Sequence, residues 1–104
     1  MKKFIDIIHE KADKKILYTI HAIRQMNSEK RLITTEEVEE KIYKGSIIEE
    51  YPDDKRGHSC LINGRIKARA IHVVCAPKDE YLAIITSYIP DQKIWNNEYT
   101  KRKK

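Results

Sequence analysis

The first part of the chain places its apolar side chains at helical intervals. Over residues 3–12 they recur three and four positions apart, which predicts a short amphipathic helix within residues 1–15. The same spacing over residues 20–31 predicts a second helix. Thr19 directly precedes that helix and is a residue type that caps helix starts, so we expect it to hold the first turn.

A third helix is predicted between Thr34 and Gly45. Thr34 and Glu37 have the spacing of a capping box, in which each side chain bonds the backbone N–H of the other residue. Gly45 follows Lys44 and is the residue type most common just past a helix C-terminus. Between the first two helices, residues 16–18 form a brief apolar run compatible with a short strand or an extended link.

The pattern changes from helical to strand-like after Gly45. Four β-prone segments follow, separated by turn signals, over residues 46–51, 58–62, 66–76 and 81–89. Asn63-Gly64 is predicted to turn the chain between the second and third of them. The sequence thus predicts an α+β fold, with two to three N-terminal helices packed on a four-stranded, mainly antiparallel sheet.

Length and composition favour a single domain over residues 1–104. The longest apolar runs fall well short of the roughly 20 residues of a membrane-spanning helix. Acidic residues interrupt the stretch after Lys2 and Lys3 that a signal peptide would need. We therefore expect no membrane association and a cytoplasmic protein whose cysteines, Cys60 and Cys75, stay reduced.

Charge is unevenly distributed along the chain. The net charge is +5, and residues 101–104 are all basic. Residues 55–78 hold six basic residues and no acidic one, whereas residues 34–54 hold eight acids. The basic segment favours a polyanion as partner, and the acidic segment a basic protein. The alternative is a mixed, solvated surface that ends in a basic tail over residues 97–104.

Several kinds of site are excluded or disfavoured. The glycines form neither a P-loop nor a dinucleotide fingerprint, and no zinc-protease or serine-hydrolase motif occurs. Four soft metal ligands are present, in His58-x-Cys60 and His72-x-x-Cys75. Because His72 and Cys75 would point to opposite faces of a regular strand, we expect buried cysteines and no metal site.

Polar residues on the second helix are candidates for chemistry on a phosphate group. His21, Arg24 and Gln25 share one side of that helix. Histidine exchanges a proton near neutral pH, and arginine binds phosphate through paired hydrogen bonds. Thr86 and Tyr88 share one face of the last strand and would add two hydroxyl groups. The alternative is an ordinary solvated helix face and ordinary strand residues.

An ordered set of motifs resembles the small prokaryotic family known as domain of unknown function 4258. The resemblance runs from about residue 18 to residue 95 and rests on Ile20-His21-Ala22-Ile23-Arg24-Gln25-Met26, Ile33-Thr34-Thr35-Glu36-Glu37-Val38, Gly45-x-Ile47-Ile48-Glu49-x-Tyr51, Ile71-His72-Val73-Val74, Ile84-Ile85-Thr86-x-Tyr88-x-Pro90-Asp91 and Trp95. It implies the toxin-like nuclease fold of RelE, barnase and the colicin ribonucleases, with a toxin-like core over residues 16–96.

The resemblance also implies a function. It suggests a metal-independent endoribonuclease of a toxin–antitoxin or related system, with RNA as substrate, an antitoxin protein as partner and no cofactor. The alternatives are a non-catalytic RNA- or protein-binding module on the same fold and a structural partner within a larger complex.

The site residues carried over from the family motifs are His21, Arg24, His72, Thr86 and Tyr88. His21 or His72 would serve as base and acid, Arg24 would stabilise the transition state, and Tyr88 would donate a proton or stack on a base. We expect His21, Arg24, His72 and Tyr88 to converge in one cleft between the second helix and the sheet. Four residues would hold the RNA backbone: Gln25 and, on one face of the third strand, Arg65, Lys67 and Arg69.

Overall fold

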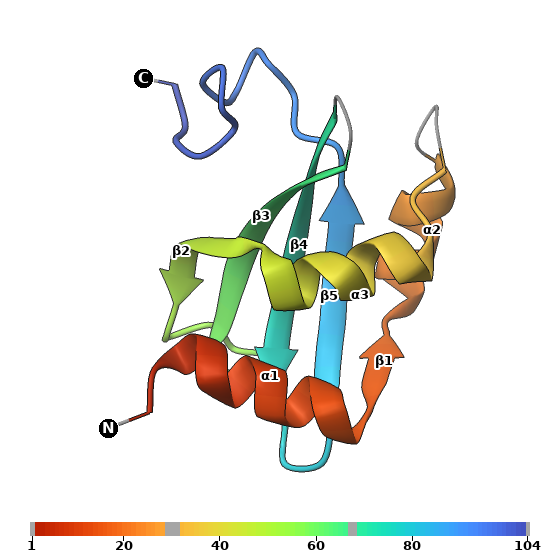
Figure 1. The fold of residues 1–104 in the computed structure, drawn as a ribbon, viewed down its shortest axis with the longest axis vertical. Helices are drawn as coiled ribbons and strands as arrows, with labels where there is room; N and C mark the ends of the chain where they lie inside the picture. The colour runs from red at the N-terminus through yellow and green to blue at the C-terminus, as the bar shows by residue number, and fades with distance from the viewer. Residues whose placement is uncertain (1, 29–31, 67–68, 104) are drawn as a thin grey trace.

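A computed structural model describes residues 2–28, 32–66 and 69–103 of the chain (Figure 1). The described residues form three helices and five strands, which confirms the α+β class. In chain order the elements are α1 (Phe4–Lys14), β1 (Ile16–Tyr18), α2 (Ile20–Ser28), α3 (Thr35–Lys44), β2 (Ser46–Tyr51), β3 (Ser59–Ile66), β4 (Arg69–Pro77) and β5 (Leu82–Tyr88). No helix among them is long and apolar enough to cross a membrane.

The strands form one mixed sheet in the order β1-β5-β4-β3-β2. Strands β2 to β5 are an antiparallel meander, whereas β1 lies parallel to β5, with Ile16 opposite Leu82. The predicted four-stranded sheet is therefore one strand short. A three-residue strand is too short to show a period, and its partner lies some 65 positions further along the chain, so local pattern alone leaves it undecided.

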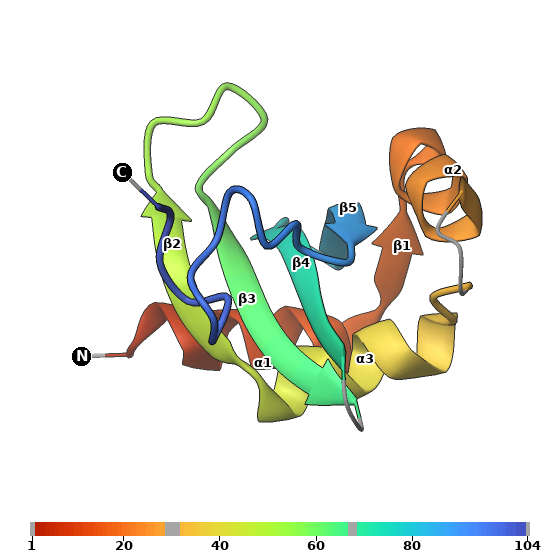
Figure 2. The same cartoon turned by 90° about the horizontal axis from the view of Figure 1, so that it is seen from above.

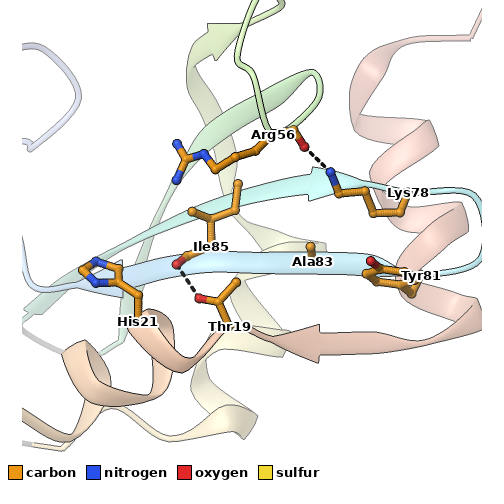
Figure 3. A pocket seen from close by; sticks show the side chains of 7 residues that line it. All are labelled: Thr19, His21, Arg56, Lys78, Tyr81, Ala83 and Ile85. Atoms are coloured by element: carbon orange, nitrogen blue, oxygen red, sulfur yellow. Dashed lines mark hydrogen bonds between the residues drawn. The ribbon is translucent and has the colours of Figure 1, made fainter.

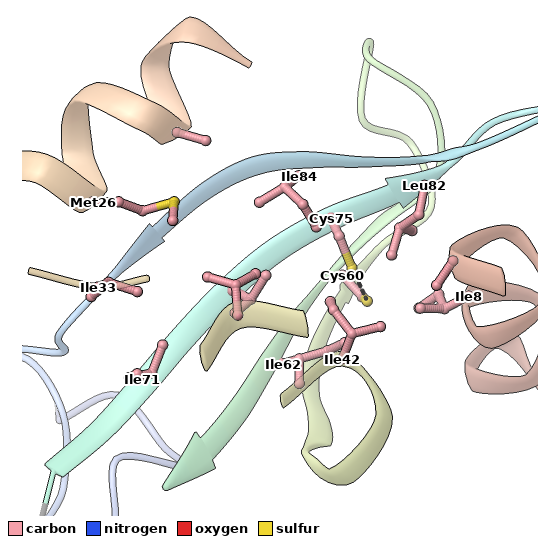
Figure 4. Close-up of a cluster of buried hydrophobic side chains, with 14 residues drawn as sticks. Ile8, Met26, Ile33, Ile42, Cys60, Ile62, Ile71, Cys75, Leu82 and Ile84 are labelled. Atoms are coloured by element: carbon pink, nitrogen blue, oxygen red, sulfur yellow. Dashed lines mark hydrogen bonds between the residues drawn. The ribbon is translucent and has the colours of Figure 1, made fainter. Parts of the chain in front are cut away.

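Helices α1 and α3 cover one face of the sheet, and α2 stands beside β5 (Figures 1 and 2). The core lies between these two helices and the sheet, where Ile8, Ile42 and Ile62 are completely buried (Figure 4). The opposite face of the sheet carries no helix comparable to α1 and α3, and we call it the open face. The functional residues described below gather there.

The start of α3 confirms the predicted capping box. The hydroxyl group of Thr34 accepts the backbone N–H of Glu37 at 3.1 Å, and the carboxylate of Glu37 accepts the backbone N–H of Thr34 at 2.9 Å. The helix ends at Gly45, which has φ −80° and so does not adopt the left-handed conformation usual for a terminal glycine. A Cβ atom at Gly45 would lie 2.6 Å from the carbonyl oxygen of Lys41, so close approach explains the glycine.

The predicted hairpin turn at Asn63-Gly64 is wrong. Both residues lie within β3, where Asn63 pairs with His72 and Gly64 with Ile71. The side chain of Lys41 passes over Gly64, and a Cβ atom there would lie 2.4 Å from the Lys41 Cδ atom. Gly64 is thus explained by packing, and a turn dipeptide in sequence does not require a turn.

The end of the chain folds back onto the open face (Figure 2). Backbone hydrogen bonds join the Lys103 N–H to the Ile94 carbonyl oxygen at 2.7 Å and the Asn96 N–H to the Lys101 carbonyl oxygen at 2.9 Å. Trp95 is buried beneath this segment. The predicted basic tail is therefore packed against the sheet over its described part, residues 97–103. We call residues 91–103 the C-terminal segment.

Candidate functional site

A groove follows β5 across the open face, between α2 and the loop of residues 52–58. It consists of two pockets that share three lining residues, His21, Arg56 and Ile85. The Tyr81 pocket has a volume of about 410 Å³ and is lined in addition by Thr19, Lys78, Tyr81 and Ala83 (Figure 3). The Thr86 pocket has a volume of about 380 Å³ and is lined in addition by Tyr51, Asp54, Val74, Thr86 and Arg102.

A β-bulge in β5 shapes the floor of the groove. Thr86 pairs with Val74 and Ile84 with Cys75, so Ile85 is an extra residue without a partner in β4. In a regular strand, two consecutive side chains point to opposite faces. The bulge breaks this alternation and allows both Ile85 and Thr86 to line the groove.

Thr19 joins the bulge to the start of α2. Its hydroxyl group donates a hydrogen bond of 2.8 Å to the Ile85 carbonyl oxygen and accepts one of 3.0 Å from the Ala22 N–H. Its own N–H donates to the Ile84 carbonyl oxygen at 3.1 Å. The predicted cap is confirmed, and it also fixes the first turn of α2 to β5. His21 is exposed in that turn and forms part of the groove wall.

The loop of residues 52–58 brings Arg56 over the groove. Two guanidinium nitrogens of Arg56 donate to the carboxylate of Asp54, at 3.1 and 3.0 Å, and these bonds hold the pKa of Asp54 well below its usual range. The ammonium group of Lys78 donates to the Arg56 carbonyl oxygen. Gly57 follows with φ 103°, a conformation that favours glycine. Figure 3 shows the Arg56 side chain extending over Ile85.

Arg102 reaches the Thr86 pocket from the C-terminal segment. It donates two hydrogen bonds to the carboxylate of Glu49, at 2.8 and 3.1 Å, and its guanidinium group lies 4.6 Å from the ring centre of Trp95. The bond from Arg102 lowers the pKa of Glu49. Tyr51 donates a short hydrogen bond to the same carboxylate, and burial together with that bond raises the pKa of Tyr51 to about 12. Both acidic partners thus hold groove residues in place.

His72 lies outside the groove, beneath the C-terminal segment. Its imidazole is completely buried, and its Nε2 donates to the Tyr99 carbonyl oxygen at 2.7 Å. Its Nδ1 lies 3.4 Å from the Tyr88 hydroxyl group, and its ring packs edge-on against Trp95 at 4.5 Å. Burial lowers the pKa of His72 below its ordinary value, so the ring is neutral at pH 7.

The predicted convergence of four residues in one cleft is therefore only partly realised. His21 lines the groove, whereas Tyr88 contacts His72 and a completely buried His72 is closed to a substrate. Arg24 is exposed on α2 but does not line either pocket of the groove. Thr86 does line it, next to His21.

The predicted basic strand face is wrong. Arg65 in β3 lies opposite Ala70 in β4, and residues directly opposite share a face, so the neighbouring Arg69 points to the other face. Arg65 is exposed with its guanidinium group 5.8 Å from the ring centre of Tyr99. Arg69 is paired with Glu37 of α3 at 2.9 Å. Lys67 lies outside the described residues.

Gln25 and the cysteines lie away from the groove. Gln25 is half-buried on α2 and does not line either pocket. Cys60 and Cys75 are free and buried on the core side of the sheet, with sulfur atoms 3.9 Å apart. Among the residues that the structure describes, no three His, Cys, Asp or Glu side chains are grouped to hold a metal ion.

Sequence reasoning missed two cations of the groove, Arg56 and Arg102. A signal for Arg56 existed in the acid-free segment of residues 55–78, which also contains Lys78. Arg102 carries no local signal, because its position depends on how the C-terminal segment folds back onto β2.

Comparison with known proteins places this groove within a family. Neither a curated protein nor a solved structure matches the chain. The family model described as "Domain of unknown function (DUF4258)" matches residues 18–89, which include Thr19, His21 and the whole of β5. The match covers more than half of the 104 residues, and the chain belongs to this family.

Proposed function

We propose that the groove binds RNA and cleaves its phosphodiester backbone without a metal ion. One observation carries the proposal: the exposed imidazole of His21 shares a pocket with the guanidinium groups of Arg56 and Arg102 and the hydroxyl group of Thr86. An imidazole exchanges protons near neutral pH, and guanidinium groups stabilise charge on phosphate oxygens. These are the two requirements of RNA cleavage by its own 2′-hydroxyl group.

In the proposed reaction, His21 is the general base. It accepts the proton of a ribose 2′-hydroxyl group, and the 2′-oxygen forms a bond to the adjacent phosphorus. The bond from phosphorus to the 5′-oxygen of the next nucleotide breaks, and that oxygen takes a proton from water. The products are a 2′,3′-cyclic phosphate and a 5′-hydroxyl end. Arg56 and Arg102 stabilise the extra negative charge of the transition state, and Thr86 donates a hydrogen bond to a phosphate oxygen.

The finer fold and the biological setting belong to the same proposal. The family motifs support a toxin-like fold of the RelE, barnase and colicin ribonuclease type. They also support a role in a toxin–antitoxin or related system, with cytoplasmic RNA as the target and an antitoxin protein as partner. The helix-free face of the sheet, flanked by α2, is compatible with that assignment.

A second candidate function is a non-catalytic RNA- or protein-binding module. Two observations favour it. His72, the other histidine of the family motifs, is completely buried and leaves the groove with one imidazole among the described residues. Arg56 and Arg102 already hold carboxylate partners, Asp54 and Glu49, which reduces the positive charge that the groove offers.

The test compares His21→Ala with Arg24→Ala. Both residues are exposed on α2, but only His21 lines the groove. The assay is cleavage of total RNA in EDTA, with mapping of the product ends and circular dichroism of each variant. We expect His21→Ala to lower the rate about 10²–10⁴-fold, as is typical for loss of a general base, and Arg24→Ala to cleave like wild type.

Two outcomes would contradict this proposal. If wild-type protein leaves RNA intact but binds it tightly, the protein is a binding module. If Arg24→Ala and His21→Ala lose activity equally while both stay folded, the active site lies on the solvated side of α2 rather than in the groove.

A further inference from the structure

We propose that the Tyr81 pocket is a base-binding subsite, which holds the nucleobase of a nucleotide whose phosphate lies between His21 and Arg56. This inference rests on the proposed function and adds how the substrate is held. It concerns the part of the groove that the cleavage reaction itself does not use.

The lining of the pocket divides into an apolar floor and a cationic rim (Figure 3). Ala83 and Ile85 form the floor, and the half-buried ring of Tyr81 lies at the end towards the β4–β5 turn. Arg56 and Lys78 supply the cations at the rim. None of the seven lining residues carries a carboxylate. A ligand that fits has a flat, uncharged body joined to an anionic group.

A nucleotide has this composition. Its base is planar and stacks on aromatic rings or on guanidinium groups, and its phosphate binds cations. The volume of about 410 Å³ leaves room for a base together with its ribose. His21 and Arg56 line both pockets, so a base in the Tyr81 pocket places its phosphate next to the groups proposed for cleavage.

The polar groups of the pocket offer little to read the edge of the base. The Thr19 hydroxyl group already donates to Ile85 and accepts from Ala22. The Lys78 ammonium group donates to the Arg56 carbonyl oxygen. Recognition then rests on stacking, which every base offers and which grows with ring area. The pocket should prefer purines to pyrimidines and discriminate poorly between the two purines.

The test is titration of the protein with AMP, CMP and ribose 5-phosphate, followed by NMR chemical shifts. We expect AMP to bind more tightly than CMP, and CMP more tightly than ribose 5-phosphate. Tyr81→Ala should weaken AMP binding about 10-fold or more and leave ribose 5-phosphate unchanged, whereas Tyr81→Phe should retain AMP binding. Ala83→Leu, which fills the floor, should also block AMP. The matched control is Tyr43→Ala, an exposed tyrosine on α3 at the helix-covered face.

A second titration, with oligoadenylate, identifies the source of the nucleotide. The groove continues past Thr86 to Arg102, so the oligonucleotide should bind more tightly than AMP. Binding of AMP without binding of the oligonucleotide would overturn the RNA assignment. Equal binding of AMP and ribose 5-phosphate, or AMP binding that Tyr81→Ala and Ala83→Leu leave unchanged, would overturn the subsite.

The subsite and the cleavage activity can fail separately. If AMP binding depends on Tyr81 but RNA stays intact, the subsite stands and the proposed cleavage is wrong. If RNA is cut in a His21-dependent manner but Tyr81→Ala changes neither AMP binding nor cleavage, the reaction stands and the subsite is wrong.

Discussion

The hydroxyl group of Thr19 donates a 2.8 Å hydrogen bond to the carbonyl oxygen of Ile85, across 66 positions of the chain. A bulge removes its extra residue from the strand ladder, and a buried carbonyl group needs another donor. Thr19 supplies this donor while it caps α2. One side chain therefore sets both the floor of the groove and the position of His21.

Replacing Thr19 should weaken the protein and the groove together. Thr19→Val keeps the side-chain shape but removes both hydrogen bonds of the hydroxyl group, and it should lower the free energy of unfolding by about 1–2 kcal/mol. Thr19→Ser keeps the hydroxyl group and should remain close to wild type. Urea denaturation of the three proteins measures the difference, and equal stability of the valine and serine variants would contradict this role.

Stability should fall in mild acid because of His72. Burial lowers the pKa of His72 in the folded protein below its ordinary value of 6.5, so the unfolded chain takes up the proton first. The stability contributed by the neutral ring is complete above about pH 6.5 and is lost as pH falls towards the lower folded pKa. Unfolding in urea at pH 7.5 and 5.5 should show a larger decrease for wild type than for His72→Gln. An identical decrease would assign the pH dependence to other groups.

Arg65 and Arg69 should behave differently although they flank the same hairpin. Arg69→Ala leaves the half-buried carboxylate of Glu37 without this partner and should cost about 1–3 kcal/mol of stability. Arg65→Ala removes an exposed side chain and should change stability by less than about 0.5 kcal/mol. Thermal unfolding of both variants makes the comparison, and similar losses would show that the two arginines share one environment.

Two glycines should differ in their tolerance of a methyl group. A Cβ atom at Gly45 meets backbone oxygens of Lys41 and Asn63 at 2.6 and 2.8 Å, whereas at Gly64 the nearest atoms belong to the Lys41 side chain. A side chain can move more easily than a backbone, so Gly45→Ala should be the more destabilising, in the range of about 1–3 kcal/mol for overpacking. Chemical denaturation of both variants decides, and the reverse order would show that Lys41 cannot move.

Local pattern predicted the elements whose stability is local. The three helices begin and end near the predicted residues, since capping and periodic apolar positions act within a few residues of each other. β1, the extension of β3 through Gly64 and the return of the C-terminal segment were missed or misread. Each depends on a partner that is distant in sequence, such as Leu82 for Ile16.

The candidate site follows the same division. His21 was singled out from its helix face, and Thr86 from its strand, and both line the groove. His72 was singled out by residue type, but its burial depends on Tyr99 and Trp95, which the strand pattern cannot place. The bulge at Ile85 cannot be read from alternation, because it is a departure from it.

The packing around Trp95 gives the protein an intrinsic optical probe. Trp95 is the sole tryptophan of the sequence and is 2% exposed. It contacts Arg102 on the C-terminal segment and His72 on the sheet. Indole emission shifts to the red when the ring meets water. Fluorescence of the unlabelled protein can therefore follow in real time whether RNA loosens the C-terminal segment from the sheet or leaves it seated.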